Sequence, residues 1–208
     1  MRTIASSRLM PVVVAHETSQ AEPLREALKA GGIFSAEVTL RTPKALEIIK
    51  IMADDPDFIV GAGTVLTAKE AATALSSGAQ FIVSPGMSIP VGDECDRLAL
   101  PYFPGVATST EIIRARDLGF TELKFFPAEA LGGASTLKAL VAPFYDMKFI
   151  PTGGINQENL DGYIALPQVL AVGGSWIVSE KYLKPGSYEK VTSLVREALA
   201  HISNFVEL

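Results

Sequence analysis

The chain has 208 residues, of which 48% are hydrophobic and 20% charged, and this composition suits one globular domain spanning residues 1–208. Its formal net charge of −5 comes from 23 acidic and 18 basic residues without runs of either sign, which argues against nucleic acid as a partner. Cys95 is the single cysteine, so a disulfide-built secreted scaffold is excluded. The opening residues lack the apolar stretch of a secretion signal, and no segment reaches the roughly 18 apolar residues of a membrane helix. We therefore expect a cytoplasmic protein without a membrane partner.

Short apolar runs rich in β-branched residues recur along the chain about 20 to 26 residues apart, which is the length of one strand–helix unit. The predicted strands are Met10–Ala15, Ala36–Leu40, Phe58–Gly63, Gln80–Pro85, Tyr102–Ala107, Glu122–Pro127, Lys148–Thr152 and Val169–Ser175. Eight such units indicate an α/β protein folded as a (β/α)₈ TIM barrel. An open doubly wound sheet usually has fewer strands and a single glycine-rich loop, whereas here glycine or proline follows nearly every strand.

Helix signals fill the segments between these strands. Pro43–Lys50 reads as a helix with Thr42 as its cap, and Ser187–Phe205 reads as the last and longest helix. Thr67 with Glu70, and Thr108 with Glu111, have the spacing of a capping box at two further helix starts. Because barrel active sites lie at the carboxyl ends of the strands, we expect the reactive side chains late in each apolar run.

The strand at residues 122–127 carries a lysine in an unusual position. Alternation places Glu122, Lys124 and Phe126 on one face and Leu123 and Phe125 on the other. If the second face packs against the helices, Lys124 points into the barrel, where removal from water favours the neutral amine that attacks a ketone. The alternative is a lysine that reaches solvent at the strand end or pairs with a carboxylate.

The strand at residues 36–40 and the residues after it show a polar face. Alternation sets Ala36, Val38 and Leu40 against Glu37, Thr39 and Arg41. Polar groups inside a barrel are costly unless they are paired or functional. We expect Glu37 to lie deep, where a carboxylate can shuttle protons, and Arg41 to lie near the mouth, where it can grip a substrate carboxylate. An ion pair of Glu37 with Lys124 or Arg41 and no catalytic duty is the alternative.

Four further strand ends carry small residues and turn formers. Gly61–Thr64 leaves room beside the Thr64 hydroxyl, and Pro85 follows the next strand, although both are also explained as tight turns. The seventh and eighth strands end in paired glycines next to hydroxyl groups, at Thr152, Gly153, Gly154, Gly174 and Ser175. At these two strand ends such groups favour binding of a substrate phosphate through backbone N–H groups.

Other chemistries lack their residues. The two histidines, His16 and His201, are far apart in the sequence and have no carboxylate at metal-ligand spacing, so we expect no metal. No histidine in the central stretch could activate Cys95, which we expect to be inert. No dinucleotide fingerprint appears, so we expect no cofactor.

Taken together, these motifs resemble those of the bacterial 2-dehydro-3-deoxy-6-phosphogluconate (KDPG) and 4-hydroxy-2-oxoglutarate (KHG) aldolases. The matching stretches are Glu37–Thr42, Val60–Leu66, Val83–Gly86, Phe103–Val106, Lys124–Glu129, Pro151–Ile155 and Gly173–Trp176, in family order over nearly the whole chain. The resemblance implies cleavage of the first substrate to pyruvate and D-glyceraldehyde 3-phosphate, and of the second to pyruvate and glyoxylate. It also implies a homotrimer, a property that the residues themselves do not show.

The resemblance assigns roles to individual residues. Lys124 would form the Schiff base and Glu37 would be the general acid and base. The substrate-binding residues would be Arg41 and Thr64 at the carboxylate, Pro85 and Phe126 along the pocket, and Thr152, Gly153, Gly154, Gly174 and Ser175 toward the phosphate. Three alternatives remain open: an aldolase for the galactonate epimer, a phosphosugar epimerase or synthase, and a non-catalytic phosphosugar-binding protein.

Overall fold

The computed structural model describes residues 4–206, with side chains described for residues 6–205. Residues 1–3, part of the opening segment in which we expect no signal sequence, and residues 207–208 lie outside this described part. The strands are β1 (Leu9–Val13), β2 (Ser35–Thr39), β3 (Ile59–Gly63), β4 (Ile82–Val83), β5 (Tyr102–Phe103), β6 (Gly105–Val106), β7 (Glu122–Phe125), β8 (Lys148–Pro151) and β9 (Val172–Gly174). Every predicted strand region overlaps one of them.

The strands form a closed parallel barrel. One sheet has the order β5-β4-β3-β2-β1-β9 and the other β6-β7-β8, with every pairing parallel. β5 and β6 are two halves of one strand position, divided by Pro104, which has no N–H to donate to a ladder. Bridges from Thr152 to Gly173 and from Phe149 to Val169 close the ring between β8 and β9. The predicted (β/α)₈ barrel is therefore confirmed.

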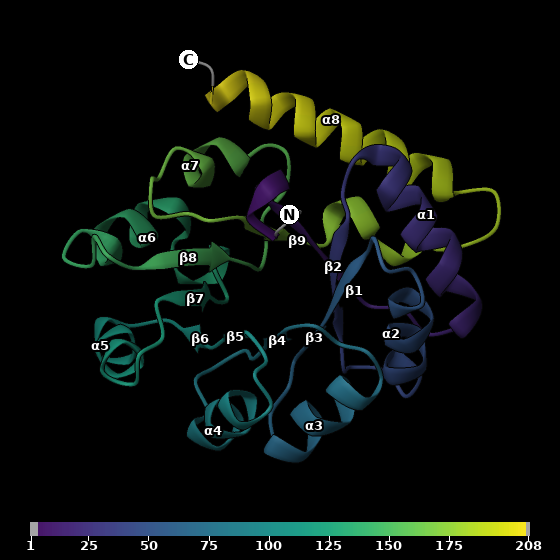
Figure 1. The fold of residues 1–208 in the computed structure, drawn as a ribbon. Helices are drawn as coiled ribbons and strands as arrows, with labels where there is room; N and C mark the ends of the chain where they lie inside the picture. The colour runs from purple at the N-terminus through teal and green to yellow at the C-terminus, as the bar shows by residue number, and fades with distance from the viewer. Residues whose placement is uncertain (1–3, 207–208) are drawn as a thin grey trace.

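Helices surround this barrel as an outer layer (Figure 1). They are α1 (Ala21–Gly31), α2 (Ala45–Ala53), α3 (Ala68–Ser76), α4 (Ile89–Arg97), α5 (Ser109–Asp117), α6 (Gly133–Val141), α7 (Leu160–Ile164) and α8 (Tyr188–Val206). Short 3₁₀ turns lie at η1 (Ile4–Ser7), η2 (Thr18–Gln20), η3 (Glu129–Leu131), η4 (Trp176–Val178) and η5 (Glu180–Tyr182). No helix within residues 4–206 combines the length and the apolar character needed to cross a bilayer.

The helix starts test the predicted caps. Both predicted capping boxes are present, one from Thr67 to Glu70 and one from Thr108 to Glu111. The prediction for Thr42 is wrong, because α2 begins at Ala45 and Lys44 is its cap residue. The Thr42 hydroxyl instead donates a hydrogen bond of 2.6 Å to the carbonyl of Ala15, which joins the end of β2 to the end of β1.

Two apolar clusters fill the molecule. The larger lies between strands and helices, and it includes Leu123 and Phe125 of β7. The smaller contains the interior side chains Met10, Phe81, Val83, Phe103 and Ile150. A filled interior is the usual state of an eight-stranded parallel barrel, so polar groups inside it need space made for them.

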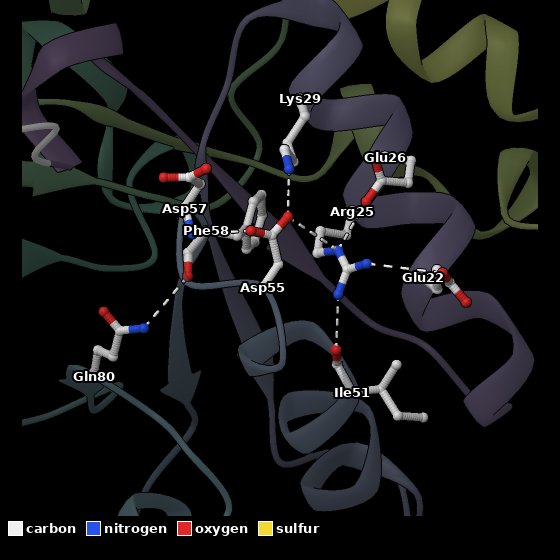
Figure 2. Close-up of polar contacts among 9 residues, drawn as sticks. All are labelled: Glu22, Arg25, Glu26, Lys29, Ile51, Asp55, Asp57, Phe58 and Gln80. Atoms are coloured by element: carbon white, nitrogen blue, oxygen red, sulfur yellow. Dashed lines mark hydrogen bonds and ion pairs between the residues drawn. The ribbon is translucent and has the colours of Figure 1, made fainter.

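An ion network ties α1 to the segment between α2 and β3 (Figure 2). Asp55 accepts a hydrogen bond from Lys29, and its Oδ2 lies 3.7 Å from Nε of Arg25. The Arg25 guanidinium also pairs with Glu26 at 3.0 Å and donates to the carbonyl of Ile51 at 3.0 Å. Because Asp55 precedes β3, this network lies at the amino ends of the strands, the face of a barrel that serves stability rather than catalysis.

Candidate active site

Lys124 points into the barrel, as the alternation predicts. Its neighbours Leu123 and Phe125 are fully buried in the outer core, while Lys124 itself is 4% exposed. Its Nζ lies 3.0 Å from Oε1 and 3.4 Å from Oε2 of Glu37, and 5.3 Å from the centre of the Phe126 ring. The alternative of a lysine reaching solvent is wrong, whereas the Glu37–Lys124 ion pair that the sequence offered as another alternative is present.

Glu37 is fully buried at the centre of β2, and a glycine on the neighbouring strand leaves space for its side chain. A Cβ built on Gly63 of β3 would lie 2.1 Å from Oε1 of Glu37 and 2.6 Å from its Cγ. Gly61 instead accommodates the Phe81 ring, since a Cβ on Gly61 would lie 2.2 Å from that ring. In the sequence these two glycines were connected only with Thr64, and Gly63 was not recognised as the neighbour of Glu37, although both glycines share the interior face of one strand.

The mouth of the barrel holds Arg41 and Thr64. Arg41 is exposed, and its Nε donates a hydrogen bond of 3.3 Å to Oγ1 of Thr64. Thr64 has φ of 59°, a left-handed conformation that is an outlier for a β-branched residue. Strained backbone of this kind clusters at ligand-binding sites, where the surrounding structure holds it in place. The expected order of depth, with Glu37 inside and Arg41 at the mouth, is confirmed by their burial.

Pro85 and Phe126 are half-buried residues that follow β4 and β7. Gly105 pairs with Lys124 in register, and a Cβ on Gly105 would lie 2.1 Å from the carbonyl oxygen of Pro85. Pro85 therefore lies two strand positions away from Lys124, beyond Gly105 of β6 and on the side opposite β8. The Phe126 ring, 5.3 Å from Nζ, is an apolar neighbour of the amine.

The ends of β8 and β9 form the other part of the site. The amides of Ala128 and Glu129 donate to the carbonyls of Thr152, at 2.8 Å, and Gly153, at 3.0 Å. In a planar trans peptide the carbonyl and the following N–H point in opposite directions. The N–H groups of Gly153 and Gly154 are therefore directed away from the β7 side and toward β9.

Thr152 and the β9 glycines complete this end of the barrel. Thr152 is buried, and a Cβ on Gly173 would lie 2.1 Å from its Oγ1. A Cβ on Gly174 would overlap the ring of Trp176, so this glycine accommodates the tryptophan. Ser175 is exposed at the rim directly after β9. The phosphate candidates of the sequence analysis thus share one edge of the barrel mouth.

The remaining chemically active side chains lie elsewhere. Within residues 4–206, no three His, Cys, Asp or Glu side chains gather as they would to hold a metal ion. His16, in the loop after β1, lies 3.5 Å from Glu180 of η5, a contact that the sequence did not reveal, and His201 contacts Asp161. Cys95 is buried on α4, and burial raises the pKa of its thiol to about 11.

A buried amine beside a buried carboxylate inside a closed parallel barrel, below a mouth that carries an arginine, is the arrangement expected of the class of Schiff-base aldolases. The chain belongs to a particular family of that class: the family profile of KDPG and KHG aldolases matches residues 2–194.

Individual relatives agree with this assignment. The 2-dehydro-3-deoxy-phosphogluconate aldolase of Dickeya dadantii is 43% identical over 95% of this chain and 93% of its own length. The KDPG aldolase structure from Legionella pneumophila, with pyruvate captured as a covalent carbinolamine, has a TM-score of 0.90 and 42% identity over 93% of this chain and 95% of its own. The Zymomonas mobilis aldolase structure with 3-phosphoglycerate has a TM-score of 0.88 and 43% identity over 96% of each chain.

Proposed function

We propose that this protein cleaves 2-dehydro-3-deoxy-6-phosphogluconate to pyruvate and D-glyceraldehyde 3-phosphate through a Schiff base on Lys124. The observation that carries the proposal is the distance of 3.0 Å between the Lys124 amine and the Glu37 carboxylate inside the barrel. The names of the relatives from Dickeya dadantii and Legionella pneumophila support the same substrate and the same covalent chemistry.

The two buried groups divide the chemistry between them. The neutral Lys124 amine attacks the C2 ketone, and the carbinolamine that forms loses water to give an iminium. Glu37 takes the proton of the C4 hydroxyl while the C3–C4 bond breaks, and the bonding electrons move onto the iminium nitrogen as an enamine forms. The aldehyde leaves, Glu37 returns its proton to C3, and water hydrolyses the resulting iminium to release pyruvate and the free amine.

The rest of the site orients the substrate. Arg41 and Thr64 are placed to hold the C1 carboxylate, because a guanidinium and a hydroxyl meet at the barrel mouth. Pro85 and Phe126 would line the pyruvate portion. Thr152 and the Gly153–Gly154 turn, with Gly174 and Ser175 opposite, would hold the phosphate, whose distance from the reacting carbons makes it an orienting group.

Borohydride trapping tests the covalent step. The protein is incubated with pyruvate, reduced, and analysed by intact mass and peptide mapping. We expect one pyruvate-derived adduct on Lys124, loss of adduct and turnover in Lys124→Ala, and retention of both in Lys148→Ala. Lys148 is the matched control because it lies at the opposite end of the barrel, where it donates to the carbonyl of Pro167. Trapping at another lysine, or substantial cleavage by folded Lys124→Ala, would overturn the assignment.

The site also suits unphosphorylated 4-hydroxy-2-oxoglutarate, because Lys124, Glu37 and Arg41 do not require a phosphate. The galactonate epimer differs at one stereocentre, and the names of the relatives favour the gluconate compound. Comparing kcat/KM for the two epimers tests this preference. An epimerase, synthase or binding protein would leave the buried Lys124–Glu37 pair without a role.

We also propose that the protein works as a cytoplasmic homotrimer. The support from this chain is a set of exposed apolar side chains on three successive strand–helix units, namely Leu66 before α3, Ile89 on α4 and Ile113 on α5. If these three side chains form one continuous patch, it is the kind of surface that another subunit covers. Sedimentation analysis tests the state, and monomers at micromolar concentration would contradict it.

A further inference from the structure

Behind the Gly153–Gly154 turn lies a contact that the reaction described above does not use. Tyr163 of α7 is fully buried, and its hydroxyl donates a hydrogen bond to Oε1 of Glu129. Burial, and then the Glu129 carboxylate, raise the pKa of the Tyr163 hydroxyl, so it remains a hydrogen-bond donor. Glu129 begins the η3 turn that follows β7.

Glu129 is also the residue on which the glycine turn rests. Its amide donates to the carbonyl of Gly153 at 3.0 Å, and a Cβ on Gly154 would lie 2.6 Å from Cβ of Glu129. Gly153 and Gly154 both have positive φ, at 104° and 81°, so their backbone takes a conformation that neighbours must maintain. Asn159 holds the far end, where Nδ2 donates to the carbonyl of Gly154 at 3.2 Å.

We propose that Glu129, anchored by Tyr163, is a positioning residue that fixes the Gly153–Gly154 turn so that its amides face the substrate phosphate. This inference rests on the phosphate role given to that turn under the proposed function. Among the described residues, Glu129 contacts Tyr163 and the glycine turn, and no hydrogen bond or ion pair joins it to Lys124 or Glu37. Its effect is therefore confined to substrates that carry a phosphate.

A purely structural role makes a different prediction. A buried tyrosine hydroxyl needs a partner, and Glu129 could serve only as that partner. Loss of the contact would then lower stability and affect all substrates alike. Substrates with and without a phosphate separate the two cases, because both use the same Schiff-base chemistry.

The test compares Tyr163→Phe, Glu129→Ala and Glu129→Gln with the unmodified protein. Kinetic constants are measured for 2-dehydro-3-deoxy-6-phosphogluconate and for 4-hydroxy-2-oxoglutarate, together with borohydride trapping of pyruvate. We expect the first two variants to raise KM for the phosphorylated substrate by about tenfold, the effect of losing one hydrogen bond to a charged group. For the unphosphorylated substrate, we expect kcat/KM within about twofold and normal trapping. Glu129→Gln keeps an acceptor for Tyr163 and is expected to restore most of the binding.

Two comparisons make the outcome decisive. Tyr145→Phe is the matched control, because Tyr145 is 81% exposed in the connection between α6 and β8. The double variant of Tyr163→Phe with Glu129→Ala should be no worse than either single change, since both break one contact. If Tyr163→Phe fails to fold, Glu129→Ala, which alters an exposed side chain, carries the same comparison.

Failure of the inference is distinguishable from failure of the proposed function. Ser175→Ala should selectively weaken the phosphorylated substrate if the phosphate lies where we propose. If Ser175→Ala does so while the Glu129 and Tyr163 variants affect both substrates equally, Glu129 is structural and the inference is overturned. If neither Ser175→Ala nor the Glu129 and Tyr163 variants discriminate between the two substrates, the proposed location of the phosphate site is wrong.

Discussion

The substitution Gly63→Ala is a direct test of how Glu37 is held. Gly63 does not have positive φ, so its backbone can accept alanine without strain. The added methyl group would meet Oε1 of Glu37 at 2.1 Å, Cγ at 2.6 Å and Cδ at 2.7 Å. Carbon and oxygen atoms do not approach so closely, so the carboxylate must move. Because Glu37 is fully buried, it has little room to move while keeping its 3.0 Å contact with Lys124.

The size of the effect follows from what Glu37 does. Inserting a methylene-sized group into a packed interior costs about 1–3 kcal/mol of stability. Displacing a general acid and base costs about 10²–10⁴ in rate, which corresponds to roughly 3–5 kcal/mol of transition-state stabilisation. Gly63→Ala should therefore lower kcat at least about 100-fold. Its loss of stability should be ordinary for an overpacked core.

Gly61→Ala is the matched control, since it lies on the same strand and face but overpacks the Phe81 ring at 2.2 Å. Both variants are measured by the rate of pyruvate release and by urea unfolding. We expect comparable losses of stability from the two changes and a large loss of kcat from Gly63→Ala alone, matching that of Glu37→Gln. Folded Gly63→Ala that retains activity within about threefold of the unmodified protein would refute the argument.

Three further predictions concern strain, ionisation and burial. Thr64→Gly removes the Thr64 hydroxyl and should raise KM for keto acids about tenfold or more. Urea unfolding should show little loss of stability, because glycine adopts the positive φ of this position without strain. A drop in stability without a change in KM would contradict this prediction. The Lys29 ammonium that donates to Asp55 holds the pKa of that carboxyl below its ordinary 3.8. The stability that this ion pair contributes is present above pH 3.8 and is lost as pH falls through the lower pKa of the folded state. Asp55→Asn should therefore have a lower free energy of unfolding than the unmodified protein at pH 7, and the two free energies should converge in acid. An equal difference in free energy at both pH values would exclude the ion pair as its cause. Burial raises the pKa of Cys95 from 9.0 to about 11, which lowers the thiolate fraction at pH 8 roughly 100-fold. Iodoacetamide should therefore label the unfolded protein and leave the folded protein unlabelled. Rapid labelling of the folded protein would show that Cys95 is accessible.

Apolar runs at the spacing of strand–helix units were sufficient to predict the strands, and alternation within two of them predicted the direction of their side chains. It correctly turned Glu37 and Lys124 inward, because a period of two and the burial of parallel strands fix the faces of each strand. The spacing of a threonine and a glutamate three positions apart also predicted the two capping boxes. These features are local, so the sequence near each residue contains the information.

Features that depend on contacts between distant segments were missed. Lys124 and Glu37 are separated by 87 positions, and their contact could be proposed only as one of two ion pairs of Glu37, the other being with Arg41. The positive φ of Thr64 is set by neighbouring strands, since no local propensity favours it for a β-branched residue. Likewise, the local proline and threonine pattern suggested a cap at Thr42, but its hydroxyl found a partner on β1 instead.

The interior glycines explain how this barrel contains polar groups at all. The interior of an eight-stranded barrel is normally filled by large apolar side chains, so a carboxylate or hydroxyl needs a vacancy on the adjacent strand. Gly63 provides that space for Glu37, and Gly173 provides it for Thr152. In the sequence these glycines resemble ordinary turn residues at strand ends, which is why their role was hidden. These glycines matter because they lack a side chain, so we expect that even alanine at either position would displace the neighbouring polar group. Glu37 at the reacting end of the site and Thr152 at its phosphate end thus each depend on a glycine of the adjacent strand.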